Sequence, residues 1–218
     1  MSTHEPVPLA EYEVYVDPAC PWSWLATRWL VGVAGERELT LRFRSFSLWM
    51  RDGEQQSLEL PPMFRELAVA SSKQSLRLMR VFEALRAEGK AGAVESLYLA
   101  WGERVFRPGP PIPPAPAVVD EVIAAVGLEE FRGAADDVSW DDAIEASMAE
   151  LTALTGPMPL VPTLVGGSPR QVLFTGAVVS APVSNAAGLE LWDAVSTTAR
   201  EPAFVSITTD KHPMPAFT

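Results

Sequence analysis

DPACPWSW, residues 17–24, contains Cys20, the only cysteine of this 218-residue chain. A short apolar run, residues 12–16, precedes this stretch and has the composition of a strand. A helix is predicted to follow, from Pro21 to about Gly35, because proline suits the first helical position, where its missing N–H costs nothing. The sequence therefore predicts that Cys20 lies at a strand-to-helix turn, directly before the N-terminus of a helix.

This position favours a chemical role for the Cys20 thiol. A helix N-terminus has unpaired backbone N–H groups and a partial positive charge, and both stabilise an anion. The pKa of a cysteine placed there can fall from about 8.5 to roughly 3.5–7.5. A cysteine is otherwise often only a small buried apolar side chain. We expect Cys20 to be a nucleophile with a lowered pKa, and Asp17 either to lie below it as a buried proton acceptor or simply to end the strand.

The composition excludes several classes of partner. The net charge is −11, with 28 acidic and 17 basic side chains, whereas nucleic acids and anionic membranes require a basic surface. No run approaches the roughly 18 apolar residues of a membrane span, and residues 1–6 lack the pattern of a signal peptide. With one cysteine, His4 and His212 make no metal-ligand cluster. We expect a cytoplasmic protein without metal, nucleic acid or membrane partners, and either a monomer or a homodimer.

Hydrophobic periodicity predicts the order of the elements along the chain. Alternating apolar and polar residues predict a strand over residues 39–48. Apolar residues from about 61 to 155 follow helical spacing, interrupted by a proline-rich run, residues 107–116, that cannot be helical. The last predicted elements are two strands over 160–165 and 171–175 and a helix over about 188–199. The order is thus strand-helix-strand, a long helical block, and strand-strand-helix.

Cys20-Pro21-Trp22-Ser23, between a strand ending in Asp-Pro and a Trp/Leu-rich helix, resembles the active site of the DsbA-like branch of the thioredoxin superfamily. The resemblance is greatest to the actinobacterial, cytoplasmic proteins typified by mycothiol-dependent nitroreductase, and it covers essentially the whole chain. It implies an α/β thioredoxin-like fold (βαβ–ββα) with a long all-helical insertion. Residues 1–56 and 156–218 would form the thioredoxin-like domain, and residues 57–155 an inserted helical lid domain.

Ser23 is the main departure from that family, which carries Cys-Pro-Trp-Cys where this chain has CPWS. The second cysteine resolves a mixed disulfide by attacking the first sulfur, which a serine cannot do. Ser23 lies three residues after Cys20, so its hydroxyl faces the same side of the first helical turn. Three explanations remain open. The chain is a natural monothiol enzyme in which Ser23 donates a hydrogen bond to the thiolate, an engineered Cys-to-Ser variant, or a protein that has lost its redox function.

The resemblance also assigns a role to Val161 and Pro162. In thioredoxin-like proteins a cis-proline starts the strand that faces the cysteine, and the backbone of the preceding residue pairs with the substrate or thiol cofactor. The alternative is an ordinary edge-strand proline. Trp22 is expected to be exposed and, with Pro21, to contribute to an apolar pocket beside the thiol. Trp24 is expected in the core.

The function that the resemblance implies is a thiol-dependent oxidoreductase with Cys20 as the nucleophile. Mycothiol or another low-molecular-weight thiol would be the co-substrate, and nitroaromatic compounds, other electrophiles or mixed disulfides would be reduced. Two alternatives remain. One is a thiol-cofactor-dependent isomerase or transferase on the same fold. The other is a redox-inactive thioredoxin-like binding module that holds ligands beside Pro162, for which the pKa of Cys20 would be ordinary and Cys20→Ala would be tolerated.

Overall fold

One mixed sheet forms the centre of the described part of the chain, which in this computed structural model comprises residues 10–58, 60–106, 113–167, 170–201, 203–204 and 214–217. Its strands are β1 (Ala10–Val16), β2 (Leu39–Ser45), β3 (Thr163–Gly166) and β4 (Gln171–Thr175). They lie in the order β2-β1-β3-β4. β1 is parallel to β2 and antiparallel to β3, and β3 is antiparallel to β4. This is the predicted βαβ–ββα arrangement.

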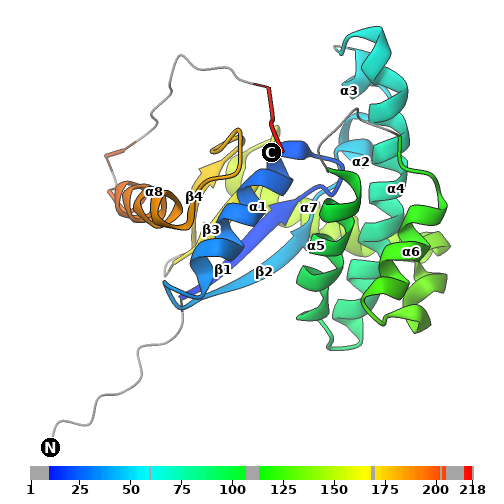
Figure 1. The fold of residues 1–218 in the computed structure, drawn as a ribbon, viewed down its shortest axis with the longest axis horizontal. Helices are drawn as coiled ribbons and strands as arrows, with labels where there is room; N and C mark the ends of the chain where they lie inside the picture. Colours follow the sequence, from blue (N-terminus) through cyan, green and yellow to red (C-terminus); the bar gives the residue numbers. More distant parts are fainter. Residues whose placement is uncertain are drawn as a thin grey trace, which may run out of the picture.

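Helices cover both faces of this sheet (Figure 1). On one face, α1 (Pro21–Ala34) packs beside α8 (Asn185–Thr198), and on the other face α7 (Asp141–Thr155) contacts β2 and β4. The central strand β1 shows the consequence, because Val14, Tyr15 and Val16 are all fully buried. Val14 and Val16 belong to the main core, whereas Tyr15 packs in a second cluster. The second half of β1 is therefore covered on both faces, and it is there that the strand is continuously apolar.

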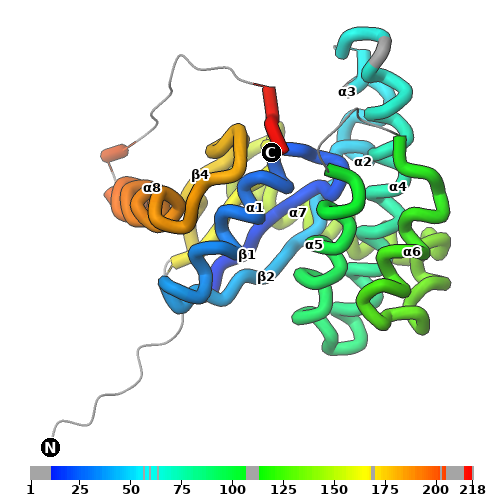
Figure 2. Tube along the Cα trace, in the orientation of Figure 1, coloured from blue at the N-terminus to red at the C-terminus, as the bar shows by residue number. Residues whose placement is uncertain are grey.

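The segment between β2 and β3 is helical, as predicted (Figures 1 and 2). It contains α2 (Leu48–Asp52), α3 (Gln55–Leu58), α4 (Pro62–Ala87), α5 (Ala93–Val105), α6 (Ala117–Ala125), two 3-10 turns (Glu129–Asp136 and Val138–Trp140) and α7. Of the proline-rich run, residues 107–112 lie outside the described residues, and 113–116 are non-helical, as expected. The division into two domains at residues 57 and 155 stays a prediction.

Two predicted strand boundaries are wrong. The strand expected over 39–48 ends at Ser45, because Ser47 caps α2 and its hydroxyl accepts a hydrogen bond from the Met50 N–H at 3.2 Å. The strand expected over 160–165 begins only at Thr163. The helix cap overrides the apolar pattern at the first place. At the second, Pro162 has no N–H to donate to a neighbouring strand.

The helical segment is attached to the thioredoxin-like part next to residues 17–24. The Trp101 indole of α5 donates a hydrogen bond to the Pro18 carbonyl at 2.7 Å. The C-terminal residues 214–217 also lie beside the start of α1 (Figure 2). There, the Phe217 ring packs on Phe106 with centroids 5.5 Å apart, and Phe106 stacks on Trp24 at 6.1 Å. Aromatic packing thus joins the two parts of the chain close to the cysteine.

Candidate active site

Cys20 occupies the predicted strand-to-helix turn. It is the N-cap of α1, with extended backbone angles (φ −83°, ψ 115°), and Pro21 follows at the first helical position. The Cys20 N–H donates to the Asp17 carbonyl at 2.9 Å, and the Cys20 carbonyl accepts from the Trp24 N–H at 3.1 Å. The side chain is nevertheless buried, with 6% of its surface exposed. The turn therefore places the sulfur at the helix N-terminus but largely out of water.

The Val161–Pro162 loop lies opposite the thiol. The peptide bond between these residues is cis, as the resemblance implies. The Cys20 thiol donates a hydrogen bond to the Val161 carbonyl, with 3.8 Å between sulfur and oxygen. The Pro162 carbonyl accepts from the Gly176 N–H at 2.7 Å, which ties the loop to the end of β4. The fold thus places the Val161–Pro162 loop against Cys20, as the resemblance implies.

The expectation of a lowered pKa for Cys20 is wrong for this arrangement. Burial raises the pKa of the Cys20 thiol, and the Asp17 carboxylate adds to that effect. The Ser23 hydroxyl and the N–H groups of Ser23 and Trp22 lower the pKa, but burial outweighs them. The Val161 carbonyl also favours the protonated thiol, because a thiolate has no hydrogen to donate to it. The resting site therefore holds Cys20 as a neutral thiol with donors directed at it.

Asp17 is a buried carboxyl group at the base of the same turn. Its oxygens accept hydrogen bonds from the Ala19 N–H at 2.7 Å, the Leu48 N–H at 2.8 Å and the Ser75 hydroxyl at 2.5 Å. Burial raises the pKa of Asp17, and these three donors oppose the shift. Asp17 therefore connects the cysteine turn with α2 and α4. Ser75 was not predicted, because a serine in the middle of a long helix carries no sequence signal.

The tryptophans divide largely as expected. Trp24 and Trp29 are buried, with exposed fractions of 1% and 3%. Trp22 and Pro21 are half-buried rather than exposed, and Trp22 packs at the edge of both apolar clusters. Trp22 therefore lies between the core and the surface next to the thiol.

Two exposed apolar side chains precede the cis-proline and were not singled out from the sequence. Met158 and Leu160 expose 69% and 52% of their surfaces. Between them, the Pro159 carbonyl accepts a hydrogen bond from the Arg51 guanidinium of α2 at 2.5 Å. The loop thus presents apolar surface to solvent while its backbone is held. The sequence signal that could have identified them is the presence of apolar residues in a loop rich in proline and glycine.

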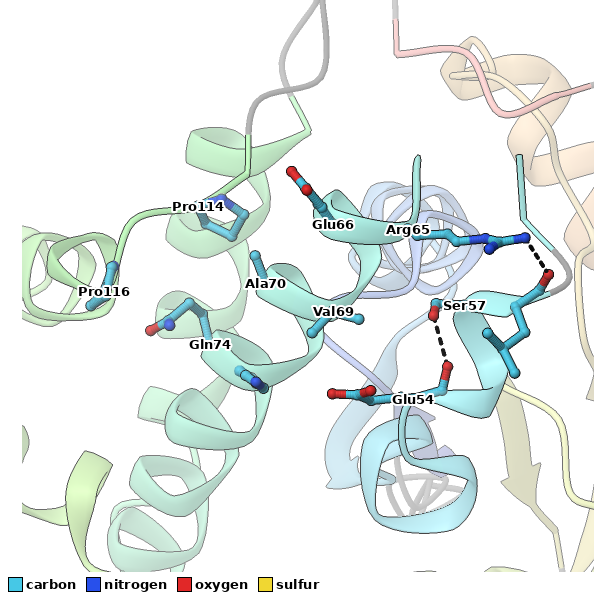
Figure 3. A pocket seen from close by; sticks show the side chains of 11 residues that line it. Glu54, Ser57, Arg65, Glu66, Val69, Ala70, Gln74, Pro114 and Pro116 are labelled. Carbon is cyan, nitrogen blue, oxygen red and sulfur yellow. Dashed lines mark hydrogen bonds between the residues drawn. The ribbon is translucent and has the colours of Figure 1, made fainter. Parts of the chain in front are cut away.

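A separate pocket lies in the helical segment (Figure 3). Its volume is about 580 Å³, and α4 lines one side with Arg65, Val69 and Gln74. Ser57 of α3 and Pro116, just before α6, lie on its other sides. Cys20 and the cis-proline loop are not among the lining residues, so this pocket is not the thiol site.

Within the described ranges, no group of three or more His, Cys, Asp or Glu side chains is placed to hold a metal ion. His4 and His212 lie outside those ranges. Among the helices that the structure describes, none combines the length and apolar character needed to cross a bilayer.

The chain has a parallel βαβ unit followed by an antiparallel ββα unit, and a helix-capping cysteine faces a cis-proline. These features define a thioredoxin-like thiol oxidoreductase with a helical insertion. Residues 19–209 match the family model described as "Rv2466c-like: Mycothiol-dependent nitroreductase Rv2466c". The match spans most of the chain, so the protein belongs to this family. It is a thiol-dependent oxidoreductase with a thiol co-substrate.

Solved structures show the same fold. The cytosolic disulfide reductase DsbM from Pseudomonas aeruginosa, in its structure with GSH, has 18% identity and a TM-score of 0.53, covering 86% of this chain and 96% of DsbM. A second DsbM structure has 17% identity. A probable DsbA oxidoreductase from Streptomyces coelicolor has 18% identity and a TM-score of 0.58, covering 92% of this chain and 94% of that protein. At these identities the similarity concerns the fold.

Proposed function

We propose that this protein is a monothiol member of its family, in which Cys20 is the nucleophile and mycothiol supplies the thiol that a second cysteine would otherwise provide. The observation that carries the proposal is the pairing of Cys20 with the Val161 carbonyl, while the fully buried Ser23 stands in the resolving position. Ser23 contributes a hydroxyl that favours the thiolate and no second sulfur. Pro21, Trp22, Val161 and Pro162 would contact the thiol or the substrate.

The reaction takes two exchange steps. The Cys20 thiolate attacks the mycothiol sulfur of a disulfide between mycothiol and another thiol compound. This forms a mixed disulfide of Cys20 with mycothiol and releases the other compound as a thiolate, which takes up a proton. A mycothiol thiolate then attacks the mycothiol-derived sulfur of the mixed disulfide, which forms mycothiol disulfide and restores the Cys20 thiolate. Ser23 cannot compete with this second thiol, so the mixed disulfide persists until mycothiol arrives.

The Val161 backbone gives the first step its geometry. In the resting site the Val161 carbonyl accepts from the thiol and favours the protonated form. An incoming thiol compound that pairs with this backbone would take over the carbonyl. The donors from Ser23 and Trp22 would then act on a thiolate that no longer faces an oxygen. Substrate binding and activation of the nucleophile would thus be coupled at one peptide group.

We propose that the substrate is a flat apolar electrophile such as a nitroaromatic compound. Met158 and Leu160, in the loop before the cis-proline, and half-buried Trp22, beside the cysteine, offer apolar and aromatic surface, which suits a flat apolar electrophile. For a nitroaromatic compound, two mycothiol molecules give up two electrons and two protons and become a disulfide. The nitro group becomes a nitroso group, and one oxygen leaves as water. The cytoplasm is the proposed compartment, because low-molecular-weight thiols are kept reduced there.

The test is the intact mass of the protein after incubation with mycothiol disulfide. We expect one mycothiol per chain, no adduct in Cys20→Ala, and loss of the adduct in Ser23→Cys, where the new thiol closes an intramolecular disulfide. Mycothiol consumption with a nitroaromatic compound should depend on Cys20. Full turnover by Cys20→Ala would refute the proposal. Turnover of a substrate without mycothiol consumption would instead support the isomerase or transferase alternative.

A further inference from the structure

Two hydroxyl groups on α1 lie on the same side of the helix as Cys20. Ser23 and Thr27 follow Cys20 by three and seven residues, a spacing that places all three on one helical face. Both side chains are fully buried, with no exposed surface. Within the described part of the chain, neither hydroxyl has a partner in hydrogen-bond geometry. Buried polar groups are usually paired, so these two call for an explanation.

Serine and threonine inside a helix usually bond to the carbonyl one turn earlier. Thr152 and Thr155 of α7 do this, with bonds to the Met148 and Leu151 carbonyls at 2.9 and 3.0 Å. The Ser23 and Thr27 hydroxyls of α1 do not make such a bond.

Tyr98 of α5 supplies the third hydroxyl of this cluster. Its ring packs against Phe43, Trp24 and Phe82, with centroids 5.3, 6.2 and 6.4 Å away. Its phenol is also buried without a partner in hydrogen-bond geometry among the described residues. A phenylalanine could make the same ring contacts without burying a hydroxyl, and burying an unpaired hydroxyl costs free energy. The burial of this phenol therefore needs an offsetting interaction.

The pKa shifts of Tyr98 and Cys20 connect the three hydroxyls with the nucleophile. Burial raises the pKa of Tyr98 well above its usual value, and the Thr27 hydroxyl opposes that shift. The charges of Cys20 and Asp17 raise the pKa of Tyr98 further. At the other end, the Ser23 hydroxyl lowers the pKa of Cys20. Asp17 is the carboxylate that acts on both Cys20 and Tyr98, and Arg51 is the cation that acts on Asp17.

We propose that Tyr98 and Thr27 are positioning residues that orient the Ser23 hydroxyl so that it donates a hydrogen bond to the Cys20 thiolate. Tyr98 donates toward Thr27, Thr27 donates toward Ser23, and Ser23 donates to the sulfur, directly or through a bound water. Each hydroxyl has a single hydrogen, so fixing the first donor fixes the direction of the row. Such rows also strengthen their last bond through polarisation. Through Tyr98, the helical insertion thereby helps to stabilise the Cys20 thiolate. This inference rests on the proposed role of Cys20 as the nucleophile.

The experiment measures the alkylation rate of Cys20 by iodoacetamide against pH in the full chain. Removing a donor hydroxyl leaves the thiolate less stabilised. Tyr98→Phe and Thr27→Val should therefore each move the midpoint upward by about 0.3–1 pH unit, which slows alkylation about two- to tenfold at a fixed pH below the midpoint. Thr27→Val keeps the shape of the side chain and serves if Tyr98→Phe does not fold. Tyr12→Phe is the matched control, because that ring packs on Trp192 in α8, and it should leave the midpoint unchanged.

The decisive comparison is made in the Ser23→Ala background. If Tyr98 acts through Ser23, Tyr98→Phe causes no further shift once the Ser23 hydroxyl is gone. An equal shift in both backgrounds, or no shift in either single variant, would overturn the proposal. The readout is chemical modification rather than turnover, so it remains valid if the proposed mycothiol reaction fails, and the two failures are distinguishable.

Discussion

Gly102 of α5 lies directly against the indole ring of Trp24 in α1. A methyl group at position 102 would lie 2.1 Å from Cε3 and Cζ3 of that ring, well inside van der Waals contact. Trp24 is one turn after Cys20, and its N–H donates to the Cys20 carbonyl. The absence of a side chain at residue 102 therefore lets the helical insertion pack on the helix that carries the nucleophile.

Replacing Gly102 with alanine should disturb this contact. We expect Gly102→Ala to lower the free energy of unfolding by about 1–3 kcal/mol, because the added methyl must displace a buried indole. Trp24 fluorescence and Cys20 alkylation should change with it. Gly32→Ala is the control, since Gly32 is exposed on α1 with no atom near an added methyl. That variant should be neutral or slightly stabilising. Equal stability of both variants would contradict the expected steric effect.

Asp17 should matter for stability through its three donors. Asp17→Ala leaves the Ala19 N–H, the Leu48 N–H and the Ser75 hydroxyl without their acceptor, and we expect a loss of about 2–4 kcal/mol in urea unfolding. Ser75→Ala removes one donor only and should cost less. A loss for Asp17→Ala no larger than that for Ser75→Ala would show that the carboxyl does not hold the turn to α2 and α4.

The charge of Asp17 should also be visible at Cys20. The carboxylate raises the pKa of the thiol, so Asp17→Asn should move the midpoint of Cys20 alkylation to lower pH. The isosteric amide keeps one oxygen acceptor and removes the charge. An unchanged midpoint in a folded Asp17→Asn variant would mean that the carboxyl is not ionised when the thiol titrates.

The raised pKa of Cys20 predicts a pH dependence of stability. Below about pH 8.5, the usual pKa of an unfolded cysteine, both states hold the proton and the contribution to stability is complete. Above that pH the unfolded state loses its proton first, so the free energy of unfolding should fall as pH rises toward the native pKa. Urea unfolding between pH 7 and 10 measures this. Cys20→Ala should lack that component, and a native protein that gains stability over the range relative to Cys20→Ala would refute it.

Met158 and Leu160 should affect substrate affinity more than turnover. Both are exposed beside the cis-proline loop, so Met158→Ser and Leu160→Ser should leave stability within about 0.5 kcal/mol. The KM for an apolar electrophile should rise about threefold or more for each, through lost apolar contact, with little change in kcat. Val138→Ser is the control, since Val138 is 66% exposed in a 3-10 turn of the insertion. A rise in KM for the control alone would place the substrate elsewhere.

The pattern of the chain predicted most of the fold because its elements follow local rules. Pro21 at a helix start, the alternation around Phe43 and the helical spacing from Val94 to Val105 each lie within one element. The predicted strand boundaries were wrong at two places. β2 ends at Ser45, before the capping Ser47, and β3 begins at Thr163, after the cis-proline. The family resemblance supplied the pairing of Cys20 with the loop before Pro162, which periodicity alone does not contain.

The sequence by itself determined that a single thiol caps a helix after a strand, and that a serine occupies the position of a resolving cysteine. Only the tertiary structure decided the surroundings of that thiol. It brings in the Val161 carbonyl from 141 residues away and connects Asp17 to Ser75 across 58 residues. It also buries the sulfur, so that desolvation outweighs the helix N-terminus and raises the pKa of Cys20. Desolvation depends on everything packed around an atom, and that is a property of the folded chain rather than of any one segment.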